Sequence, residues 1–179
     1  VSIDNVPQLG TELCEVDVVT REACGNTVRN ITASPEAGID PDEPFDVTPY
    51  AYTHFKYLLR NPICQEMGRK FKISFSSSEK DSSLGFMNDI GYIAQEKIIN
   101  GEKVRGFKVY VGGSLGAQPI LAYKVYDFLP EDKIVPFSES VIRVFDRYGE
   151  RTKRNRARLK YLIKDIGIEE FMNRVHNES

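Results

Sequence analysis

The sequence predicts an α+β fold in which helices pack on an antiparallel or mixed β-sheet. Residues 69–75 alternate apolar and polar side chains with the two-residue period of a strand that buries one face. Residues 90–111 hold two extended stretches joined by Asn100 and Gly101, the dipeptide most typical of a tight β-hairpin. Residues 136–176 carry apolar side chains at helical spacing, so helices follow the sheet.

Size and charge limit the classes of protein that this chain can represent. Its 179 residues suffice for one domain with a hydrophobic core, and 41% of them are hydrophobic. A net charge of −2 argues against a protein that binds nucleic acid over its whole surface. No apolar run approaches the roughly 20 residues of a membrane helix, and no signal-peptide pattern is present. We therefore predict one domain, residues 1–179, of a cytoplasmic protein without a membrane partner.

Cysteine and histidine are scarce. Cys14, Cys24 and Cys64 are widely spaced, odd in number and form no C-x-x-C motif, which favours reduced thiols over a disulfide framework. The two histidines, His54 and His176, do not join a cysteine at the spacing of a zinc site. The sequence thus predicts no metal site built by this chain.

The N-terminal stretch is predicted to be a lead-in, residues 1–20, that contains a short helix. Pro7 suits the first turn of a helix, where a missing N–H does no harm, and apolar residues follow at helical spacing. A brief extended piece is predicted at Val18 and Val19.

A second helix is predicted after an acidic loop. Residues 33–47 are rich in Pro, Gly, Asp and Glu, which is typical of a loop. Thr48 is a suitable N-cap with Pro49 at the first helical position, and the helix should end near Leu59 or Arg60 because Pro62 follows closely.

Two lysines lie close together on the strand at residues 69–75. Phe71 and Ile73 point to one face and Lys70 and Lys72 to the other, with lysine Cα atoms about 6.6 Å apart at a rise of about 3.3 Å per residue. Like charges so close repel unless an anion is near. A solvated strand face explains the pattern, since exposed lysines are common. An anion-binding site is the alternative.

A glycine-rich loop follows the returning strand of the hairpin. The strand is predicted at residues 104–111, and residues 112–116 read G-G-S-L-G, which matches neither of the common nucleotide-binding motifs. Such a loop exposes backbone N–H groups and lets a ligand approach closely, although a simple tight turn explains it equally. The apolar run at residues 119–129 is ambiguous between strand and helix.

Three helices are predicted within residues 136–176. Pro136 begins the first, and the others span about 152–165 and 167–176, with a glycine between them. The basic run at residues 147–160 is interpreted as a solvated or ligand-facing helix flank, with nucleic-acid binding as the alternative.

Four segments of the chain match, in order, the motifs of one enzyme family. They are residues 23–30, reading A-C-G-N-T-V-R-N against A-C-G-D-T-V-R-N; 69–72, reading R-K-F-K; 111–116, reading V-G-G-S-L-G against V-G-G-G-L-G; and 148–161, which includes A-R-L-K-Y. A single motif is moderately specific, whereas four in this order and spacing are strongly so. On these motifs the chain resembles the sirohaem-dependent nitrite and sulfite reductases over nearly its whole length.

The resemblance implies a function and a set of site residues. The family reduces sulfite to sulfide or nitrite to ammonia with six electrons, using sirohaem and a 4Fe-4S cluster. Arg29, Lys70 and Lys72 match its catalytic, substrate-binding cations. The implied cofactor-binding residues are Asn30, Arg69, Gly112, Gly113, Ser114, Leu115 and Gly116. Arginine offers a bidentate fork and lysine a compact charge that can also pass protons, so both suit an oxyanion. The resemblance thus favours the anion site over the solvated face.

The chain also departs from the family. A 4Fe-4S cluster requires four cysteine thiolates, and this chain has three cysteines, none in a paired motif. Ala33 and Ser34 stand where many members have a cysteine before the proline. The family's N-terminal ferredoxin-like piece and C-terminal repeat are absent from the chain. The resemblance therefore implies the first sirohaem-facing lobe of a longer reductase, without the half that carries the cluster cysteines.

That interpretation sets the expected partners and cofactors. We expect the isolated chain to bind neither sirohaem nor cluster stoichiometrically and to have no reductase activity. In the longer protein, the partners are the remaining lobes, sulfite or nitrite, and ferredoxin or a flavoprotein as electron donor. A non-catalytic module that binds an anion or a tetrapyrrole is the alternative function.

Overall fold

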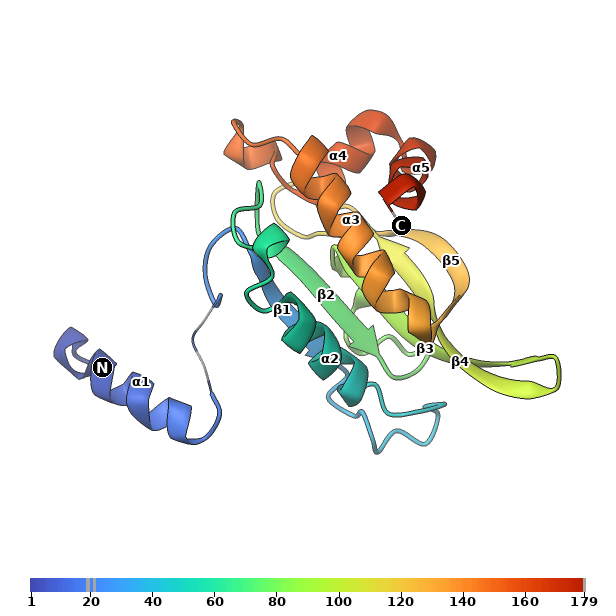
Figure 1. Ribbon diagram of the computed structural model, residues 1–179, viewed down its shortest axis with the longest axis horizontal. Helices are drawn as coiled ribbons and strands as arrows, with labels where there is room; N and C mark the ends of the chain where they lie inside the picture. Colours follow the sequence, from blue (N-terminus) through green and yellow to red (C-terminus); the bar gives the residue numbers. More distant parts are fainter. Residues whose placement is uncertain (19, 21, 179) are drawn as a thin grey trace.

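The chain forms a five-stranded sheet with helices packed on it (Figure 1). The computed structural model describes residues 1–18, 20 and 22–178. The extended piece predicted at Val18 and Val19 lies partly outside the described residues, because Val19 is not among them.

The sheet is mixed. Its strands are β1 (Val28–Ala33), β2 (Phe71–Ser76), β3 (Ile90–Ile99), β4 (Glu102–Val111) and β5 (Tyr123–Pro130), and their order in space is their order in the chain. The first three strands are parallel to one another, whereas β3, β4 and β5 run antiparallel. The α+β prediction is confirmed in its mixed form.

Five α-helices accompany the sheet. They are α1 (Val6–Glu15), α2 (Thr48–Leu58), α3 (Ile134–Tyr148), α4 (Leu159–Ile166) and α5 (Ile168–Glu178). Short 3₁₀ turns occur at Ile3–Asn5, Pro62–Cys64, Gly85–Met87, Glu131–Lys133 and Arg154–Arg156. In Figure 1, α2 and α3 lie across one face of the sheet, with α4 and α5 beside the end of α3. No residue of α1 is buried, and the helix stands apart from the body.

The core lies between the sheet and helices α2 and α3. Phe71, Ile73 and Phe75 of β2 are fully buried, as the alternation predicts. The Phe75 ring stacks on Tyr92 of β3 with centroids 4.8 Å apart, and Phe107 of β4 meets Tyr92 edge-on at 5.6 Å. Aromatic pairs in these geometries stabilise beyond their buried area, so they fix β2, β3 and β4 against each other.

The predicted β-hairpin is confirmed. Asn100 and Gly101 have φ values of 55° and 85°, which the two central positions of a type I′ turn require. Ile99 pairs with Glu102 directly across the turn. Figure 1 shows the hairpin projecting beyond the rest of the sheet.

Two helix starts differ from the sequence prediction by one or two residues. Thr48 is the first helical residue rather than the N-cap, and its N–H donates to the Asp46 side chain at 2.8 Å. Helix α3 begins at Ile134 instead of Pro136, because proline is tolerated anywhere in the first turn, where N–H groups have no partner within the helix.

In two further segments the structure resolves what the residue periodicity does not. The ambiguous run at 119–129 becomes strand from Tyr123, paired with β4. The helix predicted at 152–165 is in fact a 3₁₀ turn and then α4, separated at Arg158, whose backbone is extended. The Arg158 side chain is engaged in a tertiary contact described below, which local periodicity cannot show.

Candidate functional site

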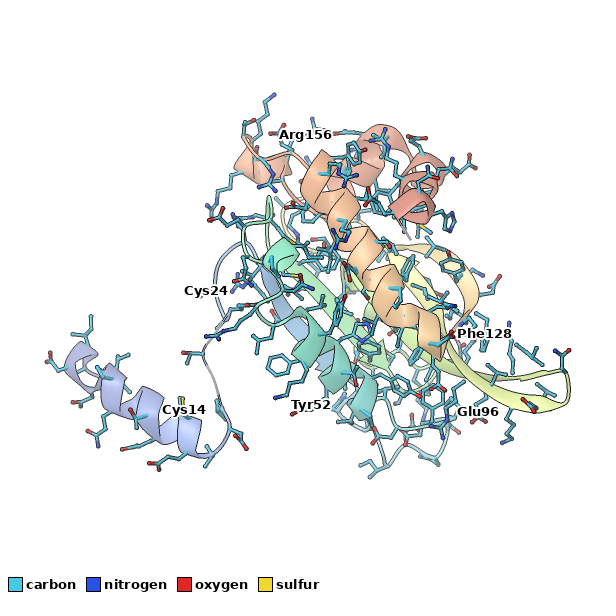
Figure 2. All side chains as sticks on the ribbon, in the orientation of Figure 1. Cys14, Cys24, Tyr52, Glu96, Phe128 and Arg156 are labelled. Carbon is cyan, nitrogen blue, oxygen red and sulfur yellow. The ribbon has the colours of Figure 1, made fainter. Side chains whose placement is uncertain are left out.

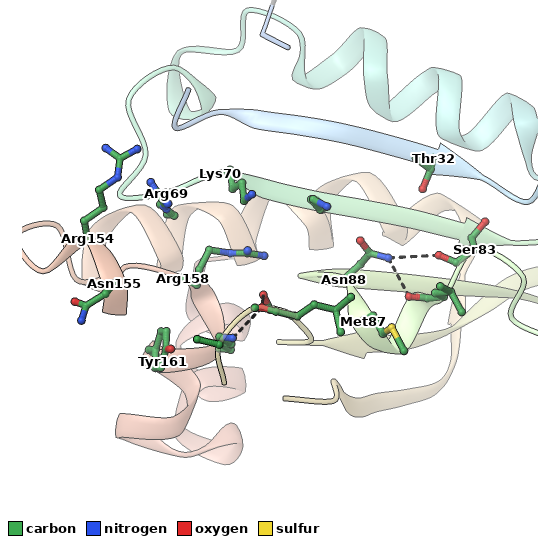
Figure 3. A pocket seen from close by; sticks show the side chains of 17 residues that line it. Thr32, Arg69, Lys70, Ser83, Met87, Asn88, Arg154, Asn155, Arg158 and Tyr161 are labelled. Atoms are coloured by element: carbon green, nitrogen blue, oxygen red, sulfur yellow. Dashed lines mark hydrogen bonds between the residues drawn. The ribbon is translucent and has the colours of Figure 1, made fainter. Parts of the chain in front are cut away.

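A cleft of about 670 Å³ opens beside β2 and is lined by cationic side chains (Figure 3). The cations come from β2 and the residues just before it, and from the segment around the start of α4: Arg69, Lys70, Lys72, Arg154, Arg158 and Lys160. Among the described residues that line the cleft, none is Asp or Glu. Such a surplus of positive charge in a recess favours anionic ligands.

The cations at the start of β2 make no direct ion pair in the described part of the chain. Arg69, Lys70 and Lys72 are each half-buried and make no ion pair there. Burial, followed by the charges of Arg154 and Arg158, lowers the pKa of Arg69. Burial and then Arg158 likewise lower the pKa of Lys70. An anion in the cleft would relieve this repulsion.

One buried carboxylate lies behind the cations. The Arg158 Nη2 atom donates to both oxygens of Asp89, at 3.1 Å and 2.9 Å. The backbone N–H of Lys72 donates to Asp89 Oδ2 at 2.9 Å. Asp89 is fully buried, and burial raises the pKa of its carboxyl group while Arg158 opposes that shift.

Lys160 lines the cleft and holds the backbone of an adjacent loop. It is buried, and its ammonium donates to the carbonyl oxygens of Leu115 at 3.2 Å and Gln118 at 2.6 Å. Burial lowers the pKa of Lys160. Ser114 and Ile120 pair their backbones across the same loop. Lys160 therefore connects α4 to Leu115 of the glycine-rich loop and to Gln118 just beyond it.

The glycines of residues 112–116 serve two purposes. Gly112 has a φ of 90°, and a Cβ there would lie 2.6 Å from Ile163 Cδ1. A Cβ on Gly113 would lie 2.3 Å from the Phe86 carbonyl oxygen. These two are needed for packing and do not line the cleft. Ser114, Leu115 and Gly116, the remaining predicted cofactor-binding residues of the loop, do line it.

Two predicted site residues of β1 lie outside the lining. Arg29 lies at a register shift, donates from Nε to the Ala23 carbonyl at 3.1 Å, and lines a separate small pocket near Leu58. Its charge nevertheless contributes to lowering the pKa of Lys70. Asn30 is exposed and pairs with Lys72 across the strands, so both side chains lie on the same face of the sheet. The roles of Arg29 and Asn30 stay predictions.

The structure adds residues that the sequence does not single out. Arg154, Arg158 and Lys160 lie in the basic run at 147–160. The sequence shows their charge, but only the structure shows that their side chains line the cleft. Asn88 also lines the cleft, and its side-chain amide donates to the Leu84 carbonyl oxygen at 2.9 Å. For Asp89 no local pattern exists, because its partner is 69 positions away in the sequence.

The thiols of this chain do not fit an iron–sulfur cluster. Cys14 and Cys24 are exposed, Cys64 is buried, and Figure 2 shows the first two well apart. Burial raises the pKa of Cys64 to about 12. Within residues 1–18, 20 and 22–178, no group of three or more His, Cys, Asp or Glu side chains could hold a metal ion. A 4Fe-4S cluster needs four thiolates, so no step of a mechanism can be assigned to a cluster held here.

No helix among the described residues combines the length and the hydropathy needed to span a membrane.

Comparisons with known proteins agree with the motifs. The family described as "Nitrite and sulphite reductase 4Fe-4S domain" matches residues 24–179. The chain is 34% identical over 178 residues to "Sulfite reductase [ferredoxin] 1" of Mycolicibacterium paratuberculosis, covering 99% of this chain and 31% of that protein. It is 31% identical to the assimilatory ferredoxin-dependent nitrite reductase of Haloferax mediterranei, covering 98% of this chain and 30% of the relative.

Solved structures extend the likeness to three dimensions. The structure of the Mycobacterium tuberculosis NirA protein superposes with a TM-score of 0.86 at 32% identity, covering 97% of this chain and 31% of NirA. Dissimilatory sulfite reductase I shares the fold, with a TM-score of 0.71 at 11% identity. The chain spans about a third of the length of the curated relatives it matches. By its sequence and fold, the chain belongs to the nitrite and sulphite reductase family.

Proposed function

We propose that this chain forms the cationic wall of the site at which a sulfite or nitrite reductase binds its substrate and sirohaem. The observation that carries the proposal is the cleft itself, where six cationic side chains gather without a lining carboxylate among the described residues. The relatives are named as sulfite and nitrite reductases, and both substrates are small oxyanions.

Lys70 and Lys72 are proposed to hold the oxyanion. They are half-buried and line the cleft, Lys72 on β2 and Lys70 immediately before it, so the predicted strand at 69–75 begins two residues later at Phe71. Neither makes a direct ion pair within the described residues. A lysine ammonium offers a compact charge and three donors, so it can hold a negative oxygen and also supply a proton. Preorganised cations at such a position stabilise the negative charge that develops as S–O or N–O bonds break.

The residues of the cleft fit sirohaem, a tetrapyrrole rich in carboxylates. Arg69, Arg154 and Arg158 line the cleft, and each guanidinium can donate one or two hydrogen bonds to a carboxylate of the cofactor. Gly116 leaves open space above the loop, since a Cβ there would meet nothing within 4 Å. When bound, sirohaem supplies the iron centre and the redox chemistry, while the chain supplies binding and electrostatics.

The rest of the reductase is proposed to come from outside this chain. The four cluster thiolates and the facing wall of the cofactor cavity belong to other lobes of a longer protein, and ferredoxin is the proposed donor because the relatives are named for it. We therefore expect the isolated chain to bind sirohaem below stoichiometry and to reduce neither sulfite nor nitrite. Absorbance spectra after reconstitution, with a turnover assay, measure both expectations.

The proposal is tested in a full-length reductase that carries this lobe. Lys72→Ala should lower kcat for sulfite or nitrite by about 10²–10³-fold, the usual cost of losing one transition-state donor. The control Lys103→Ala removes a lysine on the β3–β4 hairpin whose side chain is 76% exposed, and its turnover should match the wild type. Equal turnover in both variants would contradict the assignment.

A further inference from the structure

Asp89 joins three segments of the chain that border the cleft. Its carboxylate accepts from the Lys72 N–H of β2 and from Arg158 just before α4. Its backbone carbonyl accepts from the N–H of Gly112, at the base of the glycine-rich loop, at 2.9 Å. One buried residue thus connects the strand, the arginine and the loop.

A buried carboxylate beside an anion site is unexpected on electrostatic grounds alone. Its negative charge opposes the binding of an anion nearby, and burial of the charged group is itself costly. Hydrogen bonds from Arg158 and from the Lys72 backbone compensate the burial. A carboxylate kept in this place must therefore either hold the fold together or hold the cations in position.

The geometry of Arg158 favours positioning. Only its Nη2 atom reaches Asp89, and its Nε is buried without a partner among the described residues. The side chain is only 15% exposed yet lines the cleft. In Figure 3 it extends from the α4 side of the cleft toward β2. Asp89 thus fixes the guanidinium through Nη2, while no hydrogen bond within the described residues uses Nη1.

We propose that Asp89 is a positioning residue for anion binding in the cleft, acting through Arg158 and the backbone of Lys72. This inference rests on the proposed function, because it concerns the same site. It makes a counterintuitive claim, since removing a negative charge next to the cleft should weaken the binding of an anion. A purely electrostatic or structural carboxylate would leave affinity unchanged or raise it.

Sulfate, a redox-inert dianion, is a suitable probe, with its affinity for this chain measured by calorimetry at low ionic strength. Asp89→Asn should weaken sulfate binding by about tenfold or more, in line with the large cost of misplaced binding groups. Circular dichroism and thermal melts confirm that the measured variant is folded. Unchanged or tighter binding by folded Asp89→Asn would overturn the inference.

A double variant that removes both charges of the buried pair tests the inference even if Asp89→Asn alone does not fold. Replacing both members of a buried ion pair is often tolerated, whereas removing one is not. Asp89→Asn with Arg158→Gln keeps the net charge of the site unchanged, so an affinity equal to the wild type would also overturn the inference. We expect about tenfold weaker binding, and we expect Asp89→Asn to add no further loss in the Arg158→Gln background.

Lys72→Ala separates this inference from the proposed function. If the wild type binds sulfate and Lys72→Ala binds it weakly, the anion site stands, and only the Asp89 variants decide the inference. If the wild type binds no sulfate, or Lys72→Ala binds it as tightly, both the anion site and the inference fail.

Discussion

Two buried polar networks in this chain differ in whether their hydrogen bonds are complete. The first, the His54 network, comprises His54, Tyr92 and Ser138 and lies between the sheet and helices α2 and α3. His54 Nδ1 bonds the Tyr50 carbonyl at 3.0 Å, and its Nε2 lies 3.2 Å from Ser138 Oγ. Tyr92 meets the same Ser138 Oγ at 2.7 Å and donates to Ile134 O at 3.1 Å.

The second, the Asp89 network, comprises Asp89, Arg158 and the N–H groups of Lys72 and Gly112. It is charged, and it leaves Arg158 Nε buried without a partner in the described chain. It also borders a cleft with further cations. The neutral network satisfies itself and needs no ligand, whereas the charged one is incomplete. That difference separates a polar group that stabilises the core from one that serves a binding site.

The largest expected effect comes from breaking the charged network. Arg158→Gln leaves Asp89 buried without a cation and should lower the free energy of unfolding by about 3–5 kcal/mol at pH 7. Because burial raises the pKa of Asp89, the carboxyl group can protonate, and the deficit should shrink as the pH falls. Urea titrations at several pH values measure it. The control Arg156→Gln, at an exposed pair with Asp165, should change stability by less than about 0.5 kcal/mol.

The His54 network should respond to pH in the opposite sense. Burial lowers the pKa of His54 to about 4 from its ordinary value of 6.5. Below pH 6.5, His54 is therefore protonated in the unfolded chain, whereas in the folded chain it stays neutral down to about pH 4. Stability should fall by about 3 kcal/mol across that window, at 1.36 kcal/mol per pKa unit. His54→Gln should remove this slope in urea titrations; an unchanged slope would show that another group causes it.

A smaller effect is expected from one hydrogen bond of the neutral network. Tyr92→Phe removes the hydroxyl that donates to the Ile134 carbonyl and bonds Ser138 Oγ, and it should destabilise the fold by about 1–2 kcal/mol. Sulfate affinity should stay the same, because Tyr92 lies in the core. The control Tyr148→Phe removes a hydroxyl from a residue that is 45% exposed and should change stability little. A loss of sulfate binding in Tyr92→Phe would contradict the separation of the two networks.

The smallest stability change is expected in the cleft itself. Lys70→Ala removes a half-buried cation without an acidic partner in the described residues, so unfolding free energy should stay within about 0.5 kcal/mol of the wild type. Its effect should appear in sulfate affinity, with several-fold weaker binding. Chemical denaturation and calorimetry on the same sample test both. A destabilised variant with unchanged affinity would make Lys70 structural.

The sequence predicts the features that depend on neighbouring residues, and it does not predict those that join residues far apart in the chain. The alternation around Phe71 and Lys72 and the Asn100-Gly101 turn depend on adjacent residues, and both are confirmed. The parallel pairing of β1 with β2 joins residues some forty positions apart, for which no local pattern exists. The same holds for the pair of Asp89 and Arg158, and Arg158 is extended where the helix predicted at 152–165 is interrupted.

The candidate site was predictable only in part for the same reason. Motif resemblance located Lys70, Lys72 and the glycine-rich loop, which the structure brings to one cleft. It also suggested Arg29, which lies at a register shift in β1, donates to the Ala23 carbonyl and is outside the lining. The direction of a side chain depends on such shifts, and a sequence motif does not carry them.

The concentration of cations in one recess has a kinetic consequence. Charges of one sign on the walls of a cleft focus the electric field and attract anions from solution before contact is made. The association rate of a dianion should therefore exceed that of a neutral molecule of equal size. This rate should fall steeply as salt is added, because the Debye length shortens to about 8 Å at 0.15 M and the charges are screened. The chain, although its net charge is −2, would then capture negative ions faster than its overall balance suggests.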